Sequence, residues 1–215
     1  MPFVLTNAPA TFQCLMNQLF QPFLRKFVLV FLDDILIYSA NMVDHLEHIQ
    51  QVFGVLRKNQ LYLKALKCSF AQSSIEYLGH IISDAGVATD PAKTKDMLAW
   101  PVPTTMTELR GFLGLTGYYR RFVRGYGIIA KPLTNILRLK TFQWNAQAQE
   151  SFDNLKVAMT TTPVLSLPNF QLPFQVETDA CADGIGAVLM QSGQPIAYLS
   201  KALGEKHKNM SIYEK

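Results

Sequence analysis

An apolar run that two adjacent aspartates interrupt is the feature that most restricts how this chain folds. Residues 27–32 and 35–38 are apolar at both alternating positions, and Asp33 and Asp34 separate them. Two short apolar segments joined by two turn-forming residues predict a β-hairpin that is buried on both faces. Paired carboxylates at its tip repel each other and lose hydration, so a cation is expected to compensate them.

The spacing alone leaves two interpretations of this tip open. Aspartate is a good turn former, so the pair could simply face solvent. Alternatively, hard carboxylate oxygens hold Mg²⁺, which activates an attacking hydroxyl and stabilises a leaving pyrophosphate in phosphoryl transfer.

Composition and length restrict the class of protein. Apolar residues make up 49% and charged residues 17% of the 215 residues, which excludes a wholly disordered, collagen-like or low-complexity chain. The longest apolar stretch, residues 27–38, is shorter than the roughly 18 residues that a membrane-spanning helix needs. No basic patch followed by an apolar core opens the chain, so we expect a protein that is not secreted and lies in the cytoplasm or nucleus.

Cysteine and histidine spacing gives no sign of a disulfide framework or a zinc site. Cys14, Cys68 and Cys181 are odd in number and widely separated, which fits a reducing compartment. His45 and His48 would share one face of a helix and could bind a metal, but their polar neighbours favour a solvated face.

Positive charge is concentrated in one segment. Residues 101–145 contain seven basic side chains and one acidic side chain, although the net charge of the whole chain is only +4. Within this segment, residues 118–126 interleave aromatic residues with arginines, a composition suited to neutralising phosphates and stacking on sugars and bases. The same residues also fit a solvated basic helix whose tyrosines belong to the core, and the segment alone does not decide between the two.

Capping residues and apolar periodicity predict the other elements. Five helices are expected, each after a residue that can begin it: Asn7, Asn41, Asp90, Thr105 and Asn145. Strands are expected at four places: 76–83, 174–178, 186–191 and 196–200. A further helix is expected to start near residue 211.

Seven motifs in order along the chain carry a resemblance to a known family. They are PFVLTNAPATFQ at 2–13, FLDDILIYS at 31–39, KCSF at 67–70, YLGH at 77–80, LRGFLGL at 109–115, YYRRF at 118–122 and TDA at 178–180. Together they resemble the reverse transcriptase to ribonuclease H region of gypsy-type long-terminal-repeat retrotransposon polyproteins, and the resemblance covers residues 2–215.

The resemblance implies roles for residues in the polymerase half. Asp33 and Asp34 match two of the three carboxylates that bind the catalytic metals, with the third expected upstream of Met1. Phe3 matches the segment beside the incoming nucleotide and template, and Gln13 lies on the helix behind it. Val4 departs from the family, which usually has glycine there, and this puts nucleotide binding in doubt.

The resemblance also implies roles for residues further along the chain. Leu78, Gly79 and His80 match the turn that grips the primer terminus. The thumb follows, with side chains that are expected to contact nucleic acid: Arg110, Tyr118, Tyr119, Arg120, Arg121 and Arg124. Asp179 matches the first of four ribonuclease H carboxylates, so it is expected to be catalytic and to bind metal.

Two neighbours of these carboxylates are not expected to bind metal. Asp183 does not match a catalytic carboxylate and is expected to serve its loop. Glu214 lies near the next ribonuclease H motif without matching it, and the remaining nuclease carboxylates are expected beyond Lys215.

The expected fold class is α+β, with a partial polymerase palm made of a helix and a β-hairpin, a helical thumb and the first strands of a ribonuclease H-like mixed sheet. The corresponding regions are 1–85 for the palm, 86–165 for thumb and connection, and 166–215 for the truncated ribonuclease H-like domain.

The implied activity is that of an RNA-directed DNA polymerase with ribonuclease H. The implied metal is Mg²⁺, with Mn²⁺ as a substitute, and the implied partners are RNA/DNA hybrid, DNA primer-template, deoxynucleoside triphosphates and the rest of the polyprotein: fingers upstream, and the remainder of ribonuclease H and integrase downstream. In an intact retrotransposon, the polymerase and the ribonuclease H are expected to act in a virus-like particle. With incomplete ligand sets, we expect this chain alone to be inactive. The alternatives are a nucleic-acid-binding remnant or domesticated module without chemistry, and a remnant that does not fold.

Overall fold

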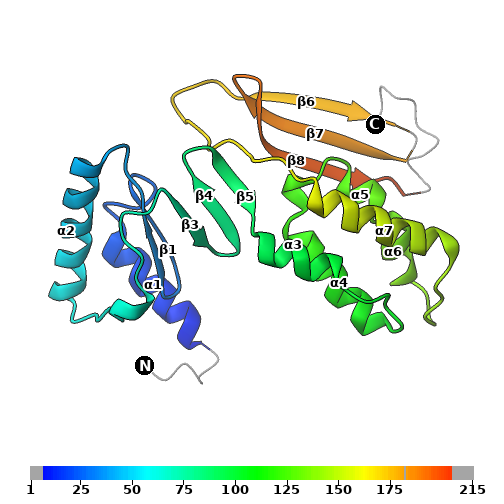
Figure 1. Ribbon diagram of the computed structural model, residues 1–215, viewed down its shortest axis with the longest axis horizontal. Helices are drawn as coiled ribbons and strands as arrows, with labels where there is room; N and C mark the ends of the chain where they lie inside the picture. The colour runs from blue at the N-terminus through cyan, green and yellow to red at the C-terminus, as the bar shows by residue number, and fades with distance from the viewer. Residues whose placement is uncertain (1–6, 182, 205–215) are drawn as a thin grey trace. The chain divides into compact units, whose positions relative to one another are not determined.

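The chain forms two compact units, Met1–Tyr77 and Leu78–Lys215, each with its own apolar core. The computed structural model describes residues 7–181 and 183–204, and it combines helices with three small sheets (Figure 1). The predicted α+β class is therefore confirmed. Phe3, Val4 and the helix expected near residue 211 lie outside the described residues.

The first unit packs two helices against a β-hairpin. Its elements are α1 (Ala8–Phe20), β1 (Val28–Phe31), β2 (Asp34–Ile37), α2 (Met42–Lys58), the short 3-10 helix η1 (Ala65–Lys67) and β3 (Ser74–Tyr77). Phe20 and Val28, both 0% exposed, join residues of α1, β1 and α2 in one core cluster. Asn41 begins α2 as predicted, because its side chain accepts a hydrogen bond from the backbone N–H of Asp44.

The hairpin differs from the prediction in burial and in register. Phe31 is 51% exposed and Leu29 is 37% exposed, so one face of β1 is not covered by the described residues. The expectation of burial on both faces is wrong for the described part of the chain. The loop consists of Leu32 and Asp33, one residue earlier than predicted, and Asp34 is already paired with Phe31 in the ladder.

The second unit begins with a hairpin and continues as a helical bundle. Strands β4 (His80–Ser83) and β5 (Gly86–Thr89) pair antiparallel. The helices are α3 (Pro91–Leu98), α4 (Met106–Tyr118), η2 (Arg120–Phe122), α5 (Tyr126–Ile129), α6 (Lys131–Ile136) and α7 (Ala146–Thr160). The predicted caps of three of these helices are present, since Asp90, Thr105 and Asn145 each accept a hydrogen bond from a backbone N–H in the first turn.

An antiparallel sheet completes the second unit. It has the order β6 (Gln175–Ala180), β7 (Gly184–Gln191) and β8 (Gln194–Ala202), and these strands lie where the sequence predicts strands. Strand β8 packs on the helices, where the backbone N–H of Gly127 donates to Ser200 Oγ at 2.7 Å. Strand β5, which the sequence did not predict, is bridged to the segment after α7 by two hydrogen bonds between Val87 and Leu165, each 2.8 Å.

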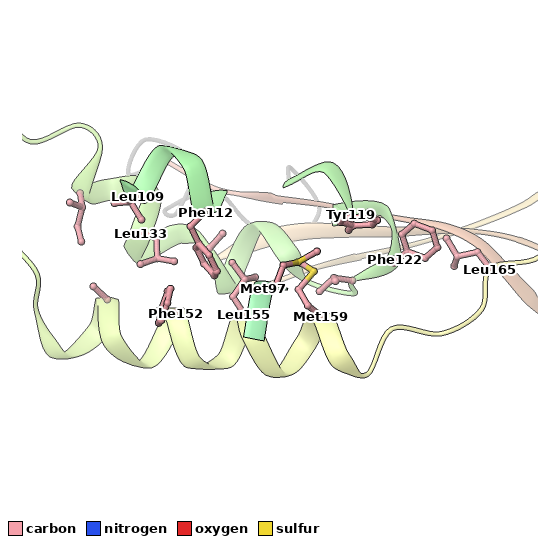
Figure 2. Close-up of a cluster of buried hydrophobic side chains, with 14 residues drawn as sticks. Met97, Leu109, Phe112, Tyr119, Phe122, Leu133, Phe152, Leu155, Met159 and Leu165 are labelled. Carbon is pink, nitrogen blue, oxygen red and sulfur yellow. The ribbon is translucent and has the colours of Figure 1, made fainter. Parts of the chain in front are cut away.

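The core of the second unit lies between α4, η2 and α7. Phe152, Leu155 and Met159 point from one face of α7 into this cluster, as their spacing predicts (Figure 2). The ring of Phe152 lies 4.6 Å from that of Phe112 on α4. This packing fixes the end of α4 and the η2 turn, and so fixes the backbone of the basic segment.

The domain division into 1–85, 86–165 and 166–215 stays a prediction. The first predicted boundary falls in the tight turn between the paired strands β4 and β5, whereas the chain divides into its two compact units after Tyr77. In the part of the chain that the structure describes, no helix is long and apolar enough to cross a membrane.

Candidate nucleic-acid interface and metal-binding carboxylates

The hairpin of the first unit presents Asp33 and Asp34 next to each other. Both residues are exposed, Asp33 in the loop and Asp34 at the start of β2. Leu32, which precedes them, has a φ of 50°, a left-handed conformation that costs a non-glycine residue about 1 kcal/mol. Such a conformation persists only where neighbouring contacts hold it.

Gln13 on α1 supplies those contacts. Its Oε1 accepts a hydrogen bond from the backbone N–H of Leu32 at 2.6 Å, and its Nε2 donates to the carbonyl oxygen of Val30 at 3.2 Å. Nε2 also donates to Asn17 Oδ1 at 2.9 Å. The amide of Gln13 is thus occupied by the hairpin that carries the aspartates. Its expected contact with nucleotide or template stays a prediction, and its observed contacts make it a support of the hairpin.

Asp34 influences a neighbouring tyrosine within the same unit. Burial raises the pKa of Tyr77, and the negative charge of Asp34 raises it further. Both effects favour the protonated form of the Tyr77 phenol. Among the described residues, however, no three His, Cys, Asp or Glu side chains gather into a group able to hold a metal.

The predicted primer-grip residues open the second unit as a strained turn. Leu78 and Gly79 have φ values of 50° and 70°, both left-handed. The Tyr118 hydroxyl donates to the carbonyl oxygen of Leu78 at 2.7 Å, and the Tyr119 hydroxyl donates to that of Gly79 at 2.8 Å. The YYRRF motif and the YLGH motif therefore meet in space.

His80 lies in an aromatic cage below this turn. Its ring stacks on Tyr118 with centroids 5.2 Å apart, meets Tyr119 edge-on at 5.4 Å and contacts Phe122 at 5.4 Å. The residue is 8% exposed, and its Nδ1 is a buried atom without a hydrogen-bond partner among the described residues. Burial lowers the pKa of His80 to about 4, with a further lowering by the positive charge of Arg121, so the imidazole is neutral at physiological pH.

The thumb residues separate into exposed and buried groups. Four arginines face solvent: Arg110, Arg120, Arg121 and Arg124. Tyr118 is 52% exposed, whereas Tyr119 is only 2% exposed and belongs to the core. The expectation that Tyr119 contacts nucleic acid is therefore corrected, because a buried ring offers no surface for stacking.

Asp179 lies on β6 opposite Gly186 and is exposed. It lines a hollow of about 340 Å³ together with Glu177, Arg124 and residues of β7 and β8. Asp183, by contrast, forms an ion pair with Lys131 Nζ at 3.1 Å, which anchors the loop before β7 and agrees with its predicted loop role.

The sequence missed the way in which the two helical histidines are used. Ser39 Oγ lies 3.1 Å from His45 Nδ1 and 2.7 Å from His48 Nδ1, and the ring of His48 stacks on Phe27 at 3.8 Å. The pair was expected to form a solvated face, but both residues are half-buried and join the end of β2 to the start of α2. Only the position of Ser39 just before the Asn41 cap hinted at this contact.

Two family models match the chain. Residues 1–82 match "Reverse transcriptase (RNA-dependent DNA polymerase)", and residues 144–215 match "RNase H-like domain found in reverse transcriptase". The Pol polyprotein from transposon 297 of Drosophila melanogaster is 43% identical over 100% of this chain and 20% of its own length. The chain belongs to the reverse transcriptase and ribonuclease H region of retrotransposon Pol polyproteins.

Other relatives agree with this assignment. The Pol polyprotein from transposon gypsy of the same fly is 34% identical over the whole chain and 22% of its own length. A foamy viral protease-reverse transcriptase, solved in complex with RNA/DNA hybrid, superposes with a TM-score of 0.89 at 22% identity, over 100% of this chain and 30% of that one. The chain thus has the fold of the matching part of that reverse transcriptase, and it spans about a fifth of the length of the curated Pol polyproteins it matches.

Replacement of Gln13 by alanine tests the support of the hairpin. The Gln13→Ala variant leaves the Leu32 N–H without its acceptor, so the free energy of unfolding should fall by about 1–2 kcal/mol. Urea unfolding and amide hydrogen exchange at Leu32 measure this effect. Gln18→Ala, at an exposed position of the same helix, is the matched control and should change neither. Equal exchange at Leu32 in both variants would contradict the assigned contact.

His80 should make stability depend on pH. Between pH 6.5 and about 4 the unfolded chain binds a proton at this imidazole and the folded chain does not, so lowering the pH should favour unfolding. Urea midpoints measured across this range should fall less steeply in His80→Phe than in the wild type. An unchanged slope in His80→Phe would show that the imidazole titrates normally.

Proposed function

We propose that this chain binds the duplex of a primer and its template, as RNA/DNA hybrid or as DNA, within an RNA-directed DNA polymerase that also carries ribonuclease H. The observation that supports this most is the joining of the Leu78–Gly79 turn to Tyr118, directly before the exposed arginines Arg120 and Arg121. A turn bonded to an exposed aromatic ring, with exposed guanidinium groups next to that ring in sequence, suits a sugar-phosphate backbone with adjacent bases.

The charges of this surface support binding of phosphates. Among the residues of 7–181 and 183–204, the single ion pair joins Lys131 to Asp183, so the exposed arginines have no carboxylate partner there. Arg121 also lies over the ring of Phe122, with its guanidinium 5.2 Å from the centroid, which orients it without neutralising it. Unpaired guanidinium groups are available to displace counterions from a duplex.

The polymerase chemistry would depend on Asp33 and Asp34. Their adjacent exposed carboxylates are hard oxygen donors, which fits Mg²⁺ or Mn²⁺ as part of a ligand set. When bound, the metal would activate the primer hydroxyl and stabilise the pyrophosphate that leaves the deoxynucleoside triphosphate. Gln13 would hold the carboxylates in place through the hairpin backbone. Asp179, exposed on β6, would contribute in the same way to the ribonuclease H centre.

A second function, nucleic-acid binding without chemistry, is favoured by one observation. The proposed binding residues all lie in the described part of the second unit: the turn, the aromatic cage of His80 and the arginines. By contrast, no three described His, Cys, Asp or Glu side chains form a group that could hold a metal. This chain alone would then bind nucleic acid. Catalysis would need further metal ligands or partners, such as the remainder of the polyprotein.

Salt dependence of hybrid binding tests the proposed interface. Each phosphate contact adds about 0.9 to the slope of log Kd against log salt, so replacing Arg120, Arg121 and Arg124 together by alanine should reduce the slope by about 2–3. Fluorescence anisotropy with a labelled RNA/DNA hybrid measures it. Lys58→Ala, an exposed cation of the first unit, is the control. The double variant Asp33→Asn/Asp34→Asn should leave the slope unchanged. A wild-type slope in the triple arginine variant would exclude this surface.

Primer extension separates the two functions. With Mg²⁺, an RNA template and deoxynucleoside triphosphates, we expect no extension by this chain, since the described carboxylates do not complete a metal site. The Asp33→Asn/Asp34→Asn variant is the matched control, and Mn²⁺ replaces Mg²⁺ in a second series. Extension by the wild type that disappears in the double variant would contradict this expectation and would show that further ligands are recruited.

A further inference from the structure

The turn at Leu78–Gly79 places Leu78 in a conformation that leucine does not favour. Leucine rarely adopts a left-handed conformation, and here Leu78 does so beside a left-handed Gly79. Both carbonyl oxygens of the turn are bonded by tyrosine hydroxyls forty residues later. The conformation is therefore maintained from outside the turn.

Both tyrosine rings are packed against other aromatic rings. Tyr119 is buried in the core, and its ring lies perpendicular to that of Tyr118 with centroids 5.0 Å apart. Tyr118 stacks on His80 with an interplanar angle of 5°. Because the rings are packed in this way, their hydroxyls hold the carbonyl oxygens of Leu78 and Gly79 at a defined position.

Gly79 is adapted to this contact in two ways. Its φ of 70° suits glycine, and a Cβ added there would lie 2.9 Å from the Tyr119 hydroxyl oxygen. The close approach of backbone and hydroxyl thus requires the absence of a side chain. The turn and the two tyrosine hydroxyls are therefore complementary in shape and in hydrogen bonding.

We propose that Tyr118 and Tyr119 are positioning residues that lock the Leu78–Gly79 turn to the arginine segment, so that both grip one duplex in a fixed relation. Tyr119 acts only through its hydroxyl, because its ring is buried, whereas Tyr118 also leaves part of its ring exposed beside the turn. The inference rests on the proposed function, since it assumes that this surface binds a primer-template duplex.

The test uses the 215-residue chain and an RNA/DNA hybrid whose 3′-terminal primer nucleotide carries a photo-crosslinking base. Tyr118→Phe/Tyr119→Phe removes both hydroxyls and keeps both rings. Tyr126→Phe is the matched control, since it removes a hydroxyl that bonds Thr116 Oγ1 at 3.0 Å in the same unit without touching the turn. Anisotropy gives Kd, mass spectrometry maps the crosslinks and thermal melting reports stability.

We expect the wild type and Tyr126→Phe to crosslink from the primer terminus to residues 78–80. The double variant should lose most of these crosslinks and bind about three- to tenfold more weakly, as expected for the loss of one or two hydrogen bonds. Its melting temperature should remain close to that of Tyr126→Phe. If the double variant does not fold, Tyr118→Phe alone, at a half-exposed ring, should still reduce the crosslinks.

Three results would overturn the inference. Crosslinks to residues 78–80 that persist in the double variant would show that the hydroxyls do not position the turn. An equal loss in Tyr126→Phe would assign the effect to general stability. A wild type that binds the hybrid but crosslinks elsewhere would separate the turn from the primer terminus. Failure of the wild type to bind at all would instead overturn the proposed function.

Discussion

The packing of α7 against α4 is the interaction on which the rest of the second unit depends. Phe152 and Leu155 bury one face of α7, and the ring of Phe112 lies 4.6 Å from Phe152. Burial of side chains of this size contributes about 1.5–3 kcal/mol each, so the pair fixes α4 strongly. Because α4 ends in Tyr118, its position determines where the tyrosines and the arginines of η2 lie.

The same core also connects the sheet to the helices. Leu165 belongs to the cluster and pairs through its backbone with Val87, while Ser166 N donates to the carbonyl oxygen of Pro195 at 2.8 Å. A glycine at position 86 is required there, since a Cβ would collide with the Leu165 carbonyl oxygen. The short segment after α7 is therefore hydrogen-bonded to both β5 and β8. It connects the β4–β5 hairpin, which follows the Leu78–Gly79 turn, to the sheet that carries Asp179.

Local signals in the sequence predict most of the helices and strands. The features that the sequence did not predict depend on contacts between residues that are far apart in the chain. Caps such as Asn41 and Thr105 act within four residues, so they are visible in the sequence and are confirmed. Tyr119 is buried in the core, and its hydroxyl bonds a carbonyl oxygen forty residues away. The composition of residues 118–126 left open whether the tyrosines belong to the core, and the resemblance assigned Tyr119 to the nucleic acid. The resemblance placed Gln13 behind the nucleotide segment, and its bonds to the hairpin backbone were not predicted because they join residues 17 and 19 positions apart.

The caged histidine has an electrostatic consequence for the whole surface. Guanidinium groups keep their charge at any pH that a protein tolerates, whereas His80, with a pKa of about 4, is uncharged at neutral pH. Burial also raises the pKa of Tyr126, so this phenol stays neutral. The potential around Arg120 and Arg121 is therefore insensitive to acidity across the neutral range, and it responds to ionic strength instead.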